Sequence, residues 1–215
     1  MSLLAPKVEN ILWNCGVSFY PEKNVVIDVS GMWRLKNLKL QTEECGFVLS
    51  LDVGRPYSIT HARKLQEMFH LPDISVLELC VETCGHVYGA MVLNLLRICN
   101  AKQKLNVFVD CRASWTTVEA CPPDCLCNQP QNWRNQNIYL SLEEVEIVNF
   151  KGSGYEIDFL KLLFRCAPLM TVTLKLAAKV SPSSRGRKET YKIFKANPAV
   201  ECHVYRKRGK EIIYA

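Results

Sequence analysis

The sequence predicts an α/β fold in which an arc of parallel strands is backed by helices. Two observations predict this class. Short segments alternate apolar and polar residues, which is the pattern of half-buried strands. Segments of helical periodicity lie between them along the chain. An apolar phrase also recurs, and each of its strands has an apolar side that only a neighbouring unit can cover. The phrase occurs at 35–40, 74–79, 142–147 and 169–174, with a looser version at 105–109.

The recurring phrase has the form Leu35-x-x-Leu38-x-Leu40. Its copies are separated by about 27 to about 39 residues, which is longer and less regular than the roughly 20–29 residues of ordinary leucine-rich repeats. Each unit must stack on the next to bury its apolar side. The pattern therefore predicts an irregular leucine-rich-repeat solenoid.

Residues 1–140 are expected to form this array. Short strands are expected at 8–15 and 25–29. The segment 58–70 opens with capping residues, and 85–99 carries a near-continuous apolar stripe, so both are predicted to be helices. Because the chain begins within core-like sequence, we expect it to start partway through a longer array.

The segment 111–140 interrupts the recurring pattern of strands and helices. Proline, asparagine and glutamine dominate it, with Trp115 and Trp133 as candidate anchors. It is therefore predicted to be a long loop. Long loops in compact proteins are either functional or tolerated insertions, and the sequence leaves both alternatives open.

Residues 141–206 read as strand, helix, strand, helix, strand, and 207–215 as a tail. We expect this unit to pack continuously on the array. Its strands place apolar side chains such as Val145 and Ile147 against polar ones such as Glu144 and Glu146, which predicts one packed and one solvated face.

The segments LEEVEIVNFKG, EIDFLKLLFRCAPLM, VSPSSRGRKETYKIFKANP and ECHVYR, taken in order, closely resemble the FBD domain at the C-terminus of many plant F-box proteins. The likeness is greatest to grass members. The preceding array resembles, through HLPDISVLELCV and LLRICNAKQKLNVFVDC, the irregular leucine-rich array of the same family. The fold implied is a solenoid that ends in an FBD-like βαβαβ unit.

The function implied is the substrate-recognition part of an SCF-type E3 ubiquitin ligase. In that family an N-terminal F-box docks the adaptor Skp1, and the C-terminal array holds the target protein. No F-box is found before residue 30 or elsewhere. A Skp1-type adaptor is therefore not expected to bind, and the target is an unknown protein. The chain is then a fragment, a truncated gene product, or a free-standing relative.

Composition favours an intracellular protein of the cytoplasm or nucleus. There is no secretory segment at the start, no glycosylation sequon, and no apolar run near the roughly twenty residues that span a bilayer. The eleven cysteines are odd in number and lie mostly in apolar runs. They are predicted to be free, buried thiols. Examples are Cys15, Cys80, Cys99 and Cys166.

A second class of function is a free-standing zinc- or nucleic-acid-binding module. Its metal candidates are Cys111, Cys121, Cys125 and Cys127, but only the Cys121-x3-Cys125 pair has acceptable spacing and no histidine is near. Free thiols are the preferred interpretation, so no metal is expected.

The net charge of +6 is concentrated in 185–210. A basic helix here is a candidate for nucleic-acid binding. Its aromatic residues, Tyr191 and Phe194, share the face that the helix needs for packing. The preferred interpretation is a solvated surface helix, and nucleic acid is not the expected partner.

No catalytic constellation is found, so neither enzymatic activity nor a cofactor is expected. Cys202 and His203 are adjacent on a predicted strand and point to opposite faces. Cys84 and His86 lie in a turn. The turn at 152–154 is reminiscent of a phosphate cradle but lacks the lysine and the spacing of one.

The remaining candidates for partner binding are the polar residues of the recurring strands, because solenoids bind partners on such extended faces. They are Lys36, Asn37, Lys39, Glu78, Glu143, Glu144, Glu146, Thr171 and Thr173.

Overall fold

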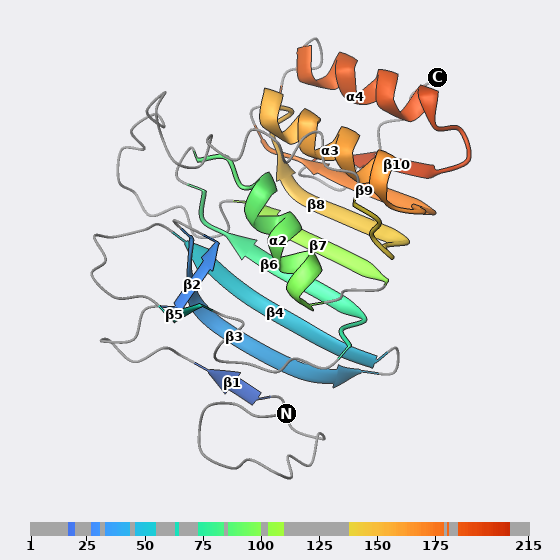
Figure 1. Cartoon of the computed structure of the whole chain (residues 1–215). Coiled ribbons are helices and arrows are strands. Elements are labelled where there is room, and N and C mark those ends of the chain that lie inside the picture. Colours follow the sequence, from blue (N-terminus) through green and yellow to red (C-terminus); the bar gives the residue numbers. More distant parts are fainter. Residues whose placement is uncertain are drawn as a thin grey trace.

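The computed structural model of the chain describes residues 17–19, 27–30, 33–43, 46–54, 63–64, 73–83, 86–99, 103–109, 138–178, 180 and 185–206. Among these residues ten strands form one sheet, in the order β10-β9-β8-β7-β6-β4-β3-β2-β5, with β1 paired to β3 (Figure 1). The strands are β1 Val17–Phe19, β2 Ile27–Ser30, β3 Trp33–Glu43, β4 Gly46–Gly54, β5 Arg63–Lys64, β6 Val76–Val81, β7 Lys104–Val109, β8 Glu144–Phe150, β9 Thr171–Leu176 and β10 Glu201–Tyr205. The described helices are α2 Gly89–Cys99, α3 Gly154–Cys166 and α4 Arg185–Ala196.

The sheet is parallel from β4 through β6 to β10, and from β7 onward each strand lies beside its predecessor in sequence. Figure 1 shows α2, α3 and α4 on the same side of this parallel part. The side chains that face the helices are buried, and Leu79, Val107, Ile147 and Leu174 are each 0% exposed. The α/β class is thus confirmed.

The first strands depart from the expected parallel arc. The segment 35–40 lies in β3, which pairs antiparallel with β4 as well as with β1 and β2. Only two residues separate β3 from β4, and a parallel crossover needs about a dozen. The short connection therefore forces a hairpin, and the prediction of a parallel strand at 35–40 is wrong. The strand β4 itself was not predicted.

The predicted helix at 58–70 is also wrong in part. Arg63 and Lys64 form β5, which pairs parallel with Ile27 and Asp28 of β2. Residues that are paired in a β-sheet are not part of an α-helix. The rest of 58–70, the strand predicted at 8–15 and the loop at 111–137 lie outside the described residues.

The C-terminal part follows the predicted order β8-α3-β9-α4-β10. Burial alternates along β9, and the helix α3 buries almost every apolar side chain, including Phe159, Leu160 and Leu163. The helix α3 has a neighbour on either side. The ring of Tyr88, just before α2, packs edge-on against the ring of Phe159. The ring centroids of Phe164 and of Phe194 in α4 are 5.9 Å apart. These ring contacts join the helices into one layer over the parallel strands.

Two residues near the turn from β8 into α3 have positive φ angles. Asn149 has φ of 66° at a register shift in β8, and its side-chain amide donates a hydrogen bond to the Val109 carbonyl over 2.9 Å. Asparagine is one of the few residues that tolerate this conformation. Gly152 has φ of 71° and lies directly against Gly186 of α4. The turn therefore links three consecutive structural units.

The cysteines agree only in part with the prediction of free thiols. Cys99 and Cys166 are free and buried, and burial raises the pKa of the Cys99 thiol to about 12. Cys80 is disulfide-bonded, so the prediction is wrong at this position. Its bonding partner and Cys15 are outside the described part of the chain. None of the described helices has the length and apolar character needed to cross a membrane.

Candidate functional site

The polar side of the parallel sheet faces away from the helices, and we call it the open face. Strand alternation and register place its side chains in rows across the strands. The middle row is Ser50, Glu78, Asn106, Glu146, Thr173 and His203. Toward the start of the strands lies the row Lys104, Glu144, Thr171 and Glu201. Toward their carboxyl ends lies the row Phe108, Val148, Lys175 and Tyr205.

Lateral hydrogen bonds connect the middle row at β4, β6 and β7. The Ser50 hydroxyl donates to the Glu78 carboxylate over 2.7 Å. The Asn106 amide donates to the other carboxylate oxygen of Glu78 over a longer 3.4 Å. Glu78 is only partly exposed, so these donors compensate for the water that its carboxylate has lost.

Two ion pairs join neighbouring strands, one between β7 and β8 and one between β8 and β9. The Lys104 ammonium lies 3.2 Å from the Glu144 carboxylate, and the Lys175 ammonium pairs with Glu146. The Glu144 side chain is 51% exposed and that of Lys175 is 48% exposed. Pairs in such water-accessible positions contribute about 1 kcal/mol or less. Their charges therefore stay available to a partner at little cost to the fold.

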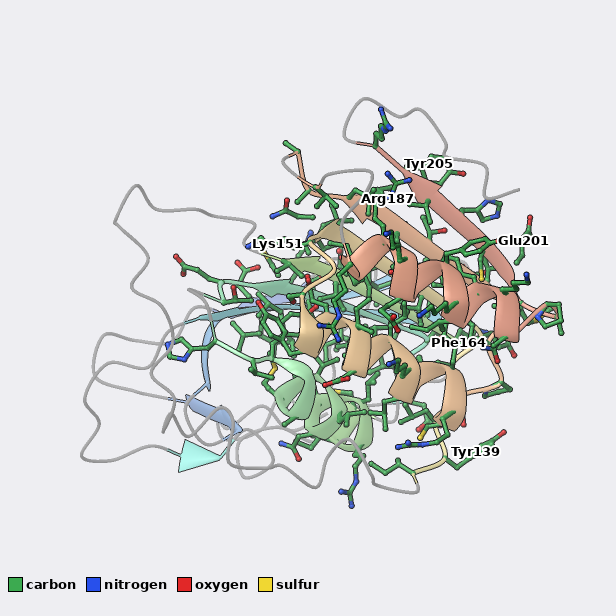
Figure 2. The ribbon with its side chains drawn as sticks, turned by 90° about the horizontal axis from the view of Figure 1, so that it is seen from above. Tyr139, Lys151, Phe164, Arg187, Glu201 and Tyr205 are labelled. Carbon is green, nitrogen blue, oxygen red and sulfur yellow. The ribbon has the colours of Figure 1, made fainter. Side chains whose placement is uncertain are left out.

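The strand β10 contributes an acid, an imidazole and a phenol to the open face. The Glu201 carboxylate lies 3.1 Å from His203 Nε2, and the His203 ring stacks on Tyr205 with centroids 6.1 Å apart. Figure 2 shows Glu201 and Tyr205 at the two ends of this strand. The open face thus carries mainly polar and charged residues at the start of its strands and adds the aromatic rings of Phe108 and Tyr205 at their ends.

Six of the nine partner-binding candidates lie on the open face. They are Lys39, Glu78, Glu144, Glu146, Thr171 and Thr173. Asn37 is in register with Asp52 of the same face, and Lys36 lies at a register shift in β3; the side chains of both are outside the described residues.

Glu143 is the exception. It precedes β8, and its exposed side chain is not part of the strand's alternation. Its backbone connects neighbouring strands instead, because its N–H donates to the Gln103 carbonyl and its carbonyl accepts from Met170. Its expected place on the binding face stays a prediction.

Sequence reasoning left out seven polar residues of these rows. They are Ser50, Lys104, Asn106, Lys175, Glu201, His203 and Tyr205. Alternation within each strand places them on the polar side, so this signal was present in the sequence. What the sequence lacks is the register between strands, which decides which of these side chains are neighbours.

The turn that is reminiscent of a phosphate cradle is already occupied by a carboxylate of the chain. Glu156 is 1% exposed. It accepts hydrogen bonds from the Ser153 N–H at 2.8 Å, the Ser153 hydroxyl at 2.7 Å and the Lys151 N–H at 3.2 Å. These are the donors that a phosphate would need. The structure therefore supports a helix-capping turn.

Burial raises the pKa of the Glu156 carboxyl, and the hydrogen bonds from Ser153 and Lys151 only partly oppose this. The stability that depends on Glu156 is therefore complete below its unfolded-state pKa of 4.5 and is lost as the pH rises through the raised folded-state pKa. We expect the free energy of unfolding of wild type, relative to Glu156→Gln, to increase as the pH falls from about 7 toward 4.5. Urea unfolding of both proteins at matched pH measures this difference, and the opposite slope would show that the hydrogen bonds outweigh burial.

The proposed nucleophiles and metal ligands do not form a site among the described residues. Burial raises the pKa of the Cys202 thiol to about 11, so it is protonated at neutral pH. The His86 N–H donates to the Thr83 carbonyl in a turn, and Cys84 is outside the described residues. In the described part of the chain no three metal-binding side chains converge. Cys111, Cys121, Cys125 and Cys127 fall outside it.

Comparison of the chain with protein-family models, with curated proteins and with solved structures found no match.

Proposed function

We propose that the protein is a protein–protein interaction module that binds its partner on the open face of the parallel sheet. In this proposal it corresponds to the substrate-recognition part of an SCF-type E3 ubiquitin ligase F-box protein, and it has no catalytic site of its own. Residues 1–140 are the leucine-rich array and 141–206 the FBD-like unit. The partner is a protein held on the polar rows, and no cofactor takes part.

One observation carries the proposal: the described helices cover only one face of a parallel sheet. Parallel sheets in enzymes are usually covered on both faces, and their strands are then apolar on both sides. Here the second side carries Glu146, Thr173 and His203 in one row across three strands. Side chains in fixed register over several strands form a broad, rigid surface, as solenoids use for binding.

The arrangement of the strands supports the solenoid part of the proposal. From β6 to β10 each strand is added beside the previous one in sequence order, whereas β5 lies beside β2 at the other end of the sheet. This order differs from that of doubly wound folds, in which the strand order reverses at a switch point where ligands bind. Without such a crevice, the extended face is the favoured place for a partner.

The experiment places a photo-crosslinking residue at Thr173 of the full chain in cells of the organism that makes it. A single cross-linked protein is then purified, and its affinity is measured for wild type and for Glu144→Lys/Glu146→Lys. Because both carboxylates lie in the centre of the open face, we expect the affinity to fall at least about tenfold, which is about 1.4 kcal/mol. Each lost ion pair is water-accessible and costs the fold about 1 kcal/mol or less.

The matched control is Asp158→Lys/Glu189→Lys, which makes the same change in net charge on the helix side of the sheet. This variant should bind the partner like wild type. The proposal is wrong if the two variants bind equally well, or if no discrete protein cross-links from position 173.

A further inference from the structure

The outer surface of α3 and α4 carries basic side chains in two parallel stripes. On α3 the stripe is Lys161 and Arg165, which are four residues apart and both exposed. On α4 the exposed stripe is Arg185, Lys188, Lys192 and Lys195. Seen from above in Figure 2, the two helices lie side by side, in agreement with the contact between Phe164 and Phe194. We call these six side chains the basic stripes.

The acidic side chains of these two helices are fewer and less exposed than the basic ones. Glu156 is buried, and Asp158 and Glu189 are half-buried. Among the described residues, Lys188 and Lys195 have no ion-pair partner. Like charges four residues apart on a helix repel one another, and a helix that is merely solvated usually alternates acids with bases. The unbalanced sign indicates that the compensating charge comes from another molecule.

Charges from both helices converge at Glu189. Its carboxylate pairs with the Lys192 ammonium over 2.9 Å. The hydrogen bond and the charge of Lys192 lower the pKa of Glu189, with smaller contributions from Lys161 of α3 and from Arg185. One carboxylate therefore already lies among three cations, which shows how the stripes would receive further carboxylates.

We propose that the basic stripes bind an acidic segment of a partner protein, rich in aspartate or glutamate. This surface is separate from the open face and lies on the other side of the sheet, so the proposal does not depend on the function proposed above. The two faces also differ in charge balance: the open face carries Glu78, Glu144, Glu146 and Glu201 beside Lys104 and Lys175, whereas the helix layer presents mainly bases.

One feature favours an acidic protein segment over a nucleic acid. Binding of single-stranded nucleic acid depends on exposed aromatic side chains on which bases stack, but Tyr155, Phe159, Phe164, Tyr191 and Phe194 are all buried or half-buried.

The probe is a fluorescent peptide of about ten glutamates. The helix α4 has 12 residues and is about 18 Å long, which about six extended residues would cover. Fluorescence anisotropy with the full chain should show binding that weakens as salt is added. In Lys161→Glu/Lys192→Glu the affinity should fall about tenfold, because favourable charges on both helices become repulsive.

The matched control is Lys104→Glu/Lys175→Glu, which changes the net charge equally on the opposite side of the sheet and should bind the peptide like wild type. Lys188→Glu/Lys195→Glu repeats the test with two unpaired lysines. If Lys161→Glu/Lys192→Glu fails to fold, this second variant still tests the proposal. The proposal is overturned if wild type does not bind the peptide, if the control loses as much affinity as the helix variants, or if an oligouridylate of equal length binds more tightly than the peptide.

Discussion

Gly186→Ala is expected to destabilise the protein by at least about 3 kcal/mol, because a Cβ at this position has no room. It would lie 2.0 Å from the Gly152 carbonyl oxygen and 2.7 Å from its carbon, and both atoms belong to backbone. The turn cannot easily retreat, since Glu156 holds the N–H groups of Lys151 and Ser153 on either side of Gly152. Helix propensity alone predicts the opposite sign, a gain of up to about 1 kcal/mol. Thermal and urea unfolding measure the difference.

Gly154→Ala is the matched control for this substitution. A Cβ at Gly154 meets no atom within 4 Å, and the residue is the first of α3. Its stability should therefore stay the same or increase by up to about 1 kcal/mol. A melting temperature of Gly186→Ala equal to that of wild type would mean that α4 does not pack on this turn.

Leu160→Ala is expected to cost about 2–5 kcal/mol, the usual range for removing a buried large aliphatic side chain. Leu160 of α3 is 0% exposed and belongs to the hydrophobic core. Phe164 comes one turn later on the same helix but is only partly buried, with its ring against Phe194. Helical periodicity alone places both residues on one apolar face and predicts a cost of about 2–5 kcal/mol for either, whereas the structure predicts a smaller cost for Phe164→Ala.

Equilibrium urea unfolding of Leu160→Ala, Phe164→Ala and Lys161→Ala tests this order. Lys161 is exposed between the two apolar positions, so its replacement should change the free energy of unfolding by no more than about 0.5 kcal/mol. A larger loss for Phe164→Ala than for Leu160→Ala would contradict the burial of α3.

The sequence predicts the C-terminal half of the fold well because local signals agree there with the tertiary structure. Alternation in β8 and β9 matches the burial of Val145, Ile147 and Val172. Pro168 and Pro198 follow the ends of α3 and α4. The same alternation identifies Glu146 and Thr173 as open-face residues. Local periodicity suffices for strands that follow one another in order.

The N-terminal half is predicted less well because its pairing depends on connections and not on periodicity. An alternating strand has the same pattern in a parallel or an antiparallel pair, so 35–40 carries no sign of the β3–β4 hairpin. The positive φ of Asn149 and the buried carboxylate of Glu156 are equally hidden, since both residues are polar and occur near a turn. Their roles follow from distances that the chain acquires only on folding.

The sequential order of β6 to β10 has a consequence for how the protein unfolds. Each of these strands borders only its immediate neighbours, so the free energy of the array is approximately a sum over units and the interfaces between them. The last helix and strand, which border the rest on one side only, are then able to detach while the central strands keep their amide hydrogens protected from exchange. Opening from that end exposes the edge of β9 and moves the already exposed bases of α4 away from those of α3, so the basic stripes depend on the least protected part of the array.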